Sequence, residues 1–286
     1  IPVLFGGVHP TYQPDATIKE DYVDMICVGE GEEAIAELCD KMGAGKDITR
    51  IKNIWVKKGE KIIKNEVRPL EQELDKYGLP ARELFPSKEM VEYGKGMTNL
   101  IAGRGCPYNC TYCINHYLQR LYAGKGKYLR MRSVESVMDE IEELREKYGV
   151  KSLAFSDDLF LVDKGWVREF CDKYKKRFDL WFSVNSRPET IDEETVGMLR
   201  DAGCKAINIG IESGDERIRK EVLRRTYSNE LLIKAFKIAK DAGLKTKAYN
   251  MIGMPGEGAE EIKRTIDINK RICPDQKYCK ILQPYP

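Results

Sequence analysis

The sequence contains no apolar run that approaches the ~20 residues needed to span a bilayer, and no signal peptide is recognisable in it. It also has little excess charge of one sign, because 48 basic residues accompany 46 acidic ones and leave a formal net charge of +2. This balance gives no reason to expect a nucleic acid or an anionic membrane as a partner. Short tandem repeats and low-complexity tracts are absent as well. We therefore expect a globular protein without a membrane span.

Histidine is scarce, whereas cysteine is not: the chain has two histidines, His9 and His116, and nine cysteines. Only three cysteines form a recognisable pattern. The others are scattered through apolar segments and are expected to be core thiols; they are Cys27, Cys39, Cys171, Cys204, Cys273 and Cys279. Free thiols in this number are typical of a reducing compartment, so we expect a cytoplasmic protein.

The patterned cysteines are Cys106, Cys110 and Cys113, with the spacing CxxxCxxC. Glycine, proline and asparagine around them argue against a regular helix and favour a loop that wraps around a bound group. Iron–sulfur clusters are held by thiolates at short spacings of this kind. Three thiolates on a four-iron cluster would leave one iron open to a small molecule. A zinc site completed by His116, three residues after Cys113, is the rival interpretation.

From residue 98 onward, strand-like segments alternate with amphipathic helical ones. The expected strands are Leu100–Ala102, Ser152–Ser156, Leu180–Val184, Ala206–Ile211, Thr246–Ile252 and Tyr278–Leu282. Helix starts are expected at Ser133, at Thr190 with Glu193 in capping-box spacing, and at Ser228. Six βα-like units in series predict a partial barrel of parallel strands over residues 98–286, with its site at the carboxyl ends of the strands.

The preceding residues are expected to form a different arrangement. Strands over Pro2–Phe5 and Asp24–Val28, followed by a helix over Glu33–Cys39, indicate the end of a Rossmann-like α/β unit in residues 1–50. Residues 51–97 are expected to be a hairpin and a linker. The chain opens directly into a strand and stops after another, so we expect a fragment of a longer protein, truncated at both ends.

Polar residues follow three of the expected barrel strands, and a glycine-rich turn follows a fourth. Asp157-Asp158 could bind a cation, an amino group or a ribose, or could cap the next helix. Arg187 could hold a carboxylate through its fixed fork or form a surface ion pair. Glu212 ends an apolar strand and should therefore have a partner. The turn Gly253-Met254-Pro255-Gly256 would let the backbone approach a flat ligand, or serve only as a turn.

The cysteine loop resembles the cluster-binding loop of the radical S-adenosylmethionine (SAM) superfamily, which has an aromatic residue before its third cysteine, as Tyr112 is here. The resemblance implies a four-iron four-sulfur cluster on Cys106, Cys110 and Cys113, with SAM chelated to the open iron. Reductive cleavage of SAM would give methionine and a 5′-deoxyadenosyl radical, while the protein binds and orients the reactants. The matching motifs end at Pro284-Tyr285-Pro286. The residues implied for SAM are Tyr112, Asp157, Glu212, Arg225, Gly253, Pro255 and Gly256.

Two glycine-rich turns precede the cysteines, and taken alone each is as consistent with a structural turn as with a nucleotide-like ligand. Together they resemble the cobalamin-binding subfamily of radical SAM proteins, in which a Rossmann-like module precedes the barrel. An Asp-x-His-x-x-Gly motif, which supplies a cobalt ligand in some cobalamin proteins, is not present, so cobalt ligation stays open. The residues implied for cobalamin are Gly6, Gly7, His9, Pro10, Thr11, Gly29, Glu30 and Gly31.

The resemblance implies an enzyme that cleaves SAM for cobalamin-dependent methyl transfer, or for an oxidative cyclisation like that of the anaerobic magnesium-protoporphyrin cyclase. A methylthiotransferase-like radical SAM enzyme without cobalamin and a zinc-stabilised binding module are the alternatives. The expected partners are a small-molecule, lipid-like or tetrapyrrole-like substrate and an electron donor such as flavodoxin or ferredoxin. No side chain is assigned as catalytic.

Overall fold

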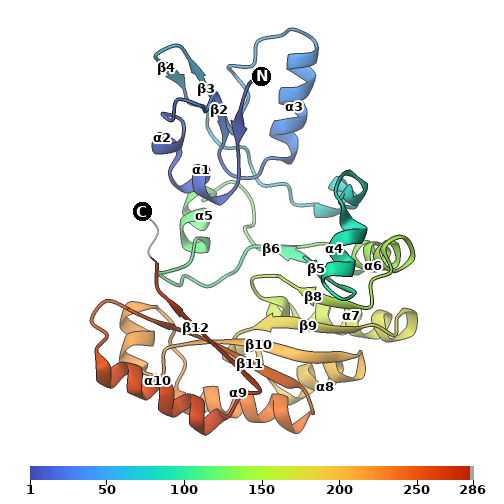
Figure 1. The fold of residues 1–286 in the computed structure, drawn as a ribbon, viewed down its shortest axis with the longest axis vertical. Helices are drawn as coiled ribbons and strands as arrows, with labels where there is room; N and C mark the ends of the chain where they lie inside the picture. The colour runs from blue at the N-terminus through green and yellow to red at the C-terminus, as the bar shows by residue number, and fades with distance from the viewer. Residues whose placement is uncertain (284–286) are drawn as a thin grey trace. The chain divides into compact units, whose positions relative to one another are not determined.

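The computed structural model describes residues 1–283 and divides them into two compact units (Figure 1). The N-terminal unit consists of residues 1–72 and 113–128, and the barrel unit consists of residues 73–112 and 129–283. The segment that begins at Cys113, the third patterned cysteine, therefore belongs to the same unit as the start of the chain. Pro284-Tyr285-Pro286, the last of the predicted motifs, lies outside the described residues.

A small mixed sheet forms the centre of the N-terminal unit. Strands β1 and β2 pair in parallel, whereas β2 with β3 and β3 with β4 are antiparallel, so the predicted hairpin is confirmed. The strands are β1 (Leu4–Phe5), β2 (Met25–Cys27), β3 (Ile54–Lys58) and β4 (Lys61–Ile63). The helices of this unit are α1 (Val8–Tyr12), α2 (Pro14–Thr17), α3 (Glu32–Gly43) and α5 (Asn115–Leu121).

Two apolar clusters stabilise the N-terminal unit on either face of β2. Met25 and Cys27 contact Ala34 and Leu38 of α3 in one cluster. Alternation of side chains along the strand places Ile26 in the other cluster, which also contains Tyr122. Tyr122 follows α5, so residues 113–128 supply part of the apolar core around β2.

The barrel unit is built on a six-stranded sheet in which all neighbouring strands are parallel. The strands run in chain order from one edge to the other, as expected for successive βα units. They are β5 (Met97–Leu100), β8 (Ser152–Phe155), β9 (Trp181–Ser186), β10 (Cys204–Glu212), β11 (Lys245–Ile252) and β12 (Gln276–Ile281). The predicted partial barrel of six parallel strands is confirmed.

Helices connect these strands (Figure 1). The connecting helices are α6 (Val134–Tyr148), α7 (Lys164–Arg177), α8 (Glu193–Asp201), α9 (Asn229–Asp241) and α10 (Ala259–Ile272), whereas α4 (Ser87–Tyr93) precedes β5. Short helical turns are η1 (Leu74–Tyr77), η2 (Arg82–Leu84), η3 (Phe160–Val162), η4 (Pro188–Thr190) and the π-helical η5 (Ile218–Val222). The remaining pair of strands, β6 (Gly103–Arg104) and β7 (Arg130–Met131), is antiparallel.

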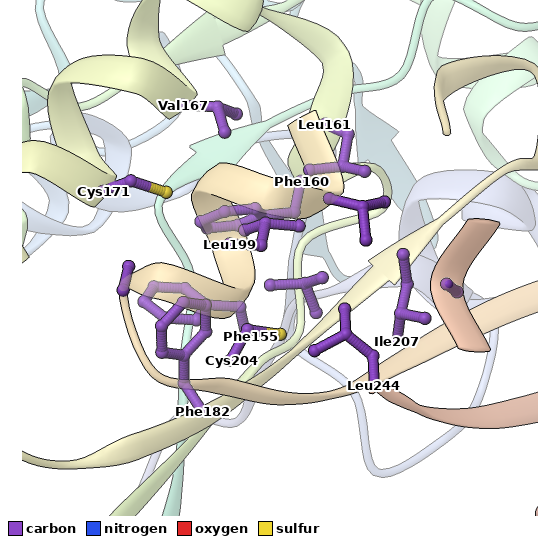
Figure 2. Close-up of a cluster of buried hydrophobic side chains, with 14 of the residues drawn as sticks. Phe155, Phe160, Leu161, Val167, Cys171, Phe182, Leu199, Cys204, Ile207 and Leu244 are labelled. Atoms are coloured by element: carbon purple, nitrogen blue, oxygen red, sulfur yellow. The ribbon is translucent and has the colours of Figure 1, made fainter. Parts of the chain in front are cut away.

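The core of the barrel unit lies between the sheet and its helices (Figure 2). Phe155 of β8, Phe160 of η3 and Phe182 of β9 gather there, with the ring of Phe155 4.7 Å from that of Phe160 and 5.7 Å from that of Phe182. Each fully buried aromatic or aliphatic side chain contributes about 1.5–3 kcal/mol relative to an exposed one. This packing makes the sheet a rigid support for the loops at its carboxyl edge.

Three local expectations have different outcomes. The caps at Ser133 and Ser228 are confirmed, because their hydroxyls accept hydrogen bonds from Ser136 N and Leu231 N. The capping box at Thr190 is wrong: Asp192 caps α8 instead, since its carboxylate accepts from Thr195 N at 2.8 Å. The first barrel strand also ends at Leu100, two residues before the predicted end at Ala102.

Within residues 1–283, every helix is too short or too polar to cross a membrane.

Candidate functional site

The cysteine loop begins where β5 ends, at the carboxyl edge of the barrel sheet. Asp157, which follows the neighbouring strand β8, holds the start of this loop. Its Oδ1 atom accepts hydrogen bonds from the backbone N–H groups of Ala102 at 3.0 Å and Gly103 at 2.7 Å. Asp157 is 4% exposed. Asp157 was predicted to contact SAM, and in this structure its oxygens bind the backbone that leads into Cys106.

Burial raises the pKa of Asp157 to about 6, despite the hydrogen bonds from Ala102 and Gly103 that favour its charged form. The neighbouring Asp158 is exposed. The two predicted carboxyl groups therefore have different surroundings: that of Asp157 binds the backbone of the cysteine loop, and that of Asp158 lies at the surface.

The middle of the cysteine loop is fastened to η5. The hydroxyl of Thr111 donates to Val222 O at 2.6 Å, and Thr111 N donates to Leu223 O at 3.4 Å. Leu223 lies in a small buried cluster with Ile218 and Met254, against which Tyr112 packs. The loop is thus attached to segments that follow β10 and β11.

Of the three patterned cysteines, Cys106 and Cys110 are buried in the barrel unit, whereas Cys113 is half-buried and opens the second segment of the N-terminal unit. All three are free thiols. Burial raises the pKa of the Cys106 thiol to about 11. Among residues 1–283, no three side chains of the histidine, cysteine, aspartate or glutamate type converge as the ligands of a single ion do. The ligands of a four-iron cluster bind different irons and need no such convergence, so the donor set is chemically suited to a cluster.

His116 was the residue on which the zinc interpretation depended. Its Nδ1 atom lies 2.6 Å from the backbone oxygen of Cys113, so Nδ1 carries the proton and donates to that oxygen. The ring is therefore oriented by a contact with the backbone just before α5. The sulfur of Cys113 has a different neighbour, because Asn115 Nδ2 donates to it at 3.4 Å.

Tyr112, Glu212 and Arg225, all predicted to contact SAM, lie in one hydrogen-bonded network. The Tyr112 hydroxyl donates to Glu212 Oε1 at 3.0 Å, and Arg225 Nη1 lies 2.9 Å from the Tyr112 oxygen and 3.2 Å from Glu212 Oε1. Burial, and next the Glu212 carboxylate, raise the pKa of Tyr112 well above its usual value. The Glu212 carboxylate therefore has the partner that its position at the end of an apolar strand requires.

The backbone geometry at the end of β10 directs Glu212 into this network. Glu212 has a φ of 65°, which is rare for a residue with a side chain, and the pairing with β11 shifts register between Gly210 and Glu212. A Cβ atom on Gly210 would lie 2.5 Å from Glu212 Oε1. The absence of a side chain at Gly210 thus leaves the space that the Glu212 carboxylate occupies.

Sequence reasoning missed two buried residues that complete the network. The Tyr227 hydroxyl donates to Ile211 O at 2.8 Å and accepts from Arg225 Nε at 3.2 Å. Arg219 of η5 is fully buried, and its Nη1 donates to Ser213 O at 2.6 Å. Neither residue lies at a strand end, and an arginine in a segment with helical spacing is normally an exposed one. The sequence pattern had no signal for either contact.

The turn after β11 is held by its own side chains. Glu257 Oε2 accepts from Gly253 N at 2.6 Å and from Met254 N at 3.1 Å, while Arg217 Nη2 donates to Gly256 O at 3.1 Å. Met254 points into the buried cluster, whereas Gly253, Pro255 and Gly256 are exposed. The three residues of this turn that were predicted to contact SAM are therefore accessible from solvent.

In the N-terminal unit, the two glycine-rich turns predicted for cobalamin lie next to each other. Gly29 N donates to Thr11 Oγ1 at 2.9 Å, and that hydroxyl donates in turn to Gly7 O at 2.7 Å. Gly6, Gly7 and His9 are exposed, whereas Pro10 and Thr11 are buried. A Cβ atom added to Gly7 would meet no heavy atom within 4 Å, so the space beside this turn is open.

The segment after the cysteines contacts both turns. Tyr117 of α5 donates its hydroxyl hydrogen to Thr11 O at 3.1 Å, and the Tyr122 oxygen accepts from Glu30 N at 2.7 Å. Glu30 and Gly31 are half-buried. These contacts were not predicted, because they join residues 106 and 92 positions apart.

The fold and the site combine a partial barrel of parallel strands with a CxxxCxxC loop after its first strand. Comparison of the sequence with known families points to the same class of protein. Residues 100–268, more than half of the chain, match the Radical SAM superfamily. The chain therefore belongs to the radical SAM superfamily.

Individual relatives are similar over nearly the whole chain. An uncharacterized methyltransferase of Pyrococcus horikoshii is 32% identical over 99% of this chain and 61% of its own length. The anaerobic magnesium-protoporphyrin IX monomethyl ester cyclase of Rubrivivax gelatinosus is 25% identical over 100% of this chain and 52% of its own. The solved radical SAM methyltransferase TsrM from Kitasatospora setae has a TM-score of 0.81 at 20% identity, over 97% of this chain and 55% of that one. The chain thus spans a little over half the length of these proteins.

Proposed function

We propose that this chain is the cofactor-binding core of a radical SAM enzyme. Cys106, Cys110 and Cys113 would hold a four-iron four-sulfur cluster, an assignment that rests on their spacing and on the family. When bound and reduced, such a cluster supplies the electron that cleaves SAM into methionine and a 5′-deoxyadenosyl radical.

The observation that carries the proposal is the network around Tyr112. It links the cysteine loop to Glu212 and Arg225 within one unit, at the carboxyl edge of the sheet. Ligand-binding sites of parallel barrels lie at this edge. The carboxylate of Glu212 is suited to a ribose hydroxyl or an amino group, and the Arg225 guanidinium is suited to a carboxylate. Both groups are paired with each other here, so SAM would exchange some of these contacts for its own.

We further propose that the N-terminal unit contributes to a cobalamin site. The exposed turn at Gly7, with open space beside it and His9 nearby, is the part of this unit best suited to an extended ligand. Gly29, Glu30 and Gly31 form the second turn, which is joined to the first by the hydrogen bond from Gly29 N to the Thr11 hydroxyl. The reaction would be methyl transfer or an oxidative cyclisation on a small-molecule substrate, with an external flavodoxin- or ferredoxin-type donor in the cytoplasm. The methyltransferase and the cyclase named above support these two reaction classes.

Anaerobic reconstitution of the chain with iron, sulfide and hydroxocobalamin tests the proposal. We expect roughly four irons per chain, formation of 5′-deoxyadenosine from SAM after reduction, and cobalamin retained through gel filtration. Cys110→Ser should lose iron and SAM cleavage together, because one cluster ligand is missing. The matched control is Cys39→Ser, an exposed cysteine outside the loop, which should keep both.

Stoichiometric zinc, without a cluster or SAM cleavage, would refute the enzyme assignment and leave the binding-module alternative. In that case His116→Ala should weaken zinc binding. An intact cluster with SAM cleavage but no retained cobalamin would instead favour the cobalamin-independent alternative.

A further inference from the structure

Arg187 is a buried cation with an unusual set of partners. It follows β9, is 6% exposed, and its Nη1 atom donates to Cys110 Sγ at 3.0 Å. Nη2 donates to Glu189 Oε1 at 2.7 Å, and the centre of the guanidinium lies 3.6 Å from the ring centroid of Tyr108. Tyr108 and Cys110 are neighbours in the cysteine loop. One side chain therefore contacts the loop both through a sulfur atom and through an aromatic face.

These contacts leave Arg187 poorly arranged to hold a substrate carboxylate. Both terminal nitrogens already have partners, and one face of the guanidinium is covered by Tyr108. Its Nε–H group is buried and has no hydrogen-bond partner among the residues described. The guanidinium of Arg187, which was predicted to hold a carboxylate or to form a surface ion pair, therefore contacts the protein's own cysteine loop.

The charge of the guanidinium matches a sulfur that is bound to a cluster better than a free thiol. A neutral thiol is a weak hydrogen-bond acceptor, and it offsets little of the cost of burying a guanidinium. Glu189 binds through only one oxygen, because its Oε2 atom is buried without a partner. A cluster-bound thiolate at Cys110 would supply the negative charge that matches this cation.

We propose that Arg187 is a positioning residue that raises the reduction potential of the cluster through the Cys110 sulfur. This inference rests on the cluster proposed above. One electron passes from the external donor to the cluster, and the cluster becomes more negative by one charge. A cation and an N–H donor at a ligand sulfur stabilise the more negative state. Tyr108 and Glu189 hold the guanidinium in place.

A redox titration of the reconstituted full chain, followed by the electron paramagnetic resonance signal of the reduced cluster, tests the inference. Arg187→Gln should reduce the ratio of reduced to oxidised cluster at a fixed potential about tenfold, which equals a shift of about 59 mV for a one-electron couple. Glu189→Gln should shift the potential in the opposite direction by a smaller amount, because it removes a compensating negative charge. Arg168→Gln, which changes an exposed arginine of α7 paired with Glu194, is the matched control and should change nothing.

An unchanged potential in a fully loaded Arg187→Gln protein would overturn the inference. If that variant binds no iron, Glu189→Gln decides: a raised potential supports the inference, and an unchanged or lowered one overturns it. Failure of the unmodified chain to assemble a cluster would refute the proposed function instead, and iron analysis distinguishes the two cases before any titration.

Discussion

Asp157 shows how one carboxyl group connects the barrel sheet to the cysteine loop. It is buried behind β8, and it accepts hydrogen bonds from the two backbone N–H groups at the start of the loop. Two amide donors favour the charged carboxylate, whereas burial favours the neutral acid. Burial is the larger effect, since the pKa is raised to about 6.

This shift predicts a specific dependence of stability on pH. The unfolded carboxyl titrates near 3.9, below its folded value of about 6. The folded state therefore binds the proton more tightly, and the contribution of Asp157 is fully present below about pH 4 and is lost as pH rises to about 6. We expect this contribution to be about 2–3 kcal/mol. Urea unfolding of the cluster-free chain between pH 4 and 7 should show it as a decline that Asp157→Asn lacks. Parallel pH profiles for the two proteins would contradict the assignment.

The residues around Glu212 show what sequence reasoning could find at this scale. Glu212 was recognisable because a carboxylate at the end of an apolar strand needs a partner. The identity of that partner was not predicted: the family implied SAM contacts for Arg225 and Tyr112, which are 13 and 100 residues away from Glu212. Arg219 and Tyr227 gave no signal, because their burial depends on the π-helical turn η5 and on the path of the chain after it.

At the scale of elements, α10 approaches the end of β10 closely enough to exclude any side chain at Gly214. A Cβ atom there would lie 2.3 Å from Arg264 O and 2.5 Å from Thr265 Cα. The amide of Gly214 donates to Thr265 Oγ1 at 2.8 Å, which holds the two elements together. The loop that follows Glu212 is therefore positioned by a helix that follows the next strand.

We expect Gly214→Ala to destabilise the chain by about 1–3 kcal/mol, because the backbone of α10 must move to admit the methyl group. Thermal and urea unfolding of both proteins measure this change. Gly197→Ala is the matched control, since Gly197 lies inside α8 and an added Cβ would meet nothing within 4 Å. It should stabilise the chain by about 0.5–1 kcal/mol. Equal stabilities for the two variants would show that α10 does not constrain this loop.

Most elements of the barrel unit could be predicted because burial on one face leaves a periodic pattern in the sequence. The six strands and the apolar stripe of α6 follow this rule. The start of α8 could not be predicted reliably, since Thr190 and Asp192 both have capping side chains, and packing of the η4 turn selects Asp192. The pair β6–β7 was missed because two-residue strands carry no period.

At the scale of the whole molecule, residues that are consecutive in the chain do not always belong to the same compact unit. Residues 113–128 follow the cysteine loop, yet Tyr122 belongs to the apolar cluster that contains Ile26 of β2. Local stability should follow these contacts rather than position in the chain, because residues open in cooperative units defined by shared packing.

Hydrogen exchange in the full chain tests this grouping. Ile26→Ala removes a fully buried side chain and should cost about 2–5 kcal/mol. We expect the amides of α5 and of Tyr122 to exchange faster in this variant, while those of β10 keep their rates. Ile209→Ala, an equally buried change in the barrel unit, should do the reverse. Faster exchange of β10 with unchanged exchange of α5 in Ile26→Ala would contradict the grouping.

Local spacing and periodic burial were enough to predict the family, the CxxxCxxC loop, the parallel barrel and the strand ends that carry polar residues. Tertiary structure decided which of those residues meet. It placed Asp157 on the loop backbone, Arg187 on the Cys110 sulfur, and residues 113–128 in the N-terminal unit. The physical reason is that a hydrogen bond between distant residues depends on the path of the whole chain, whereas a motif depends only on its neighbours.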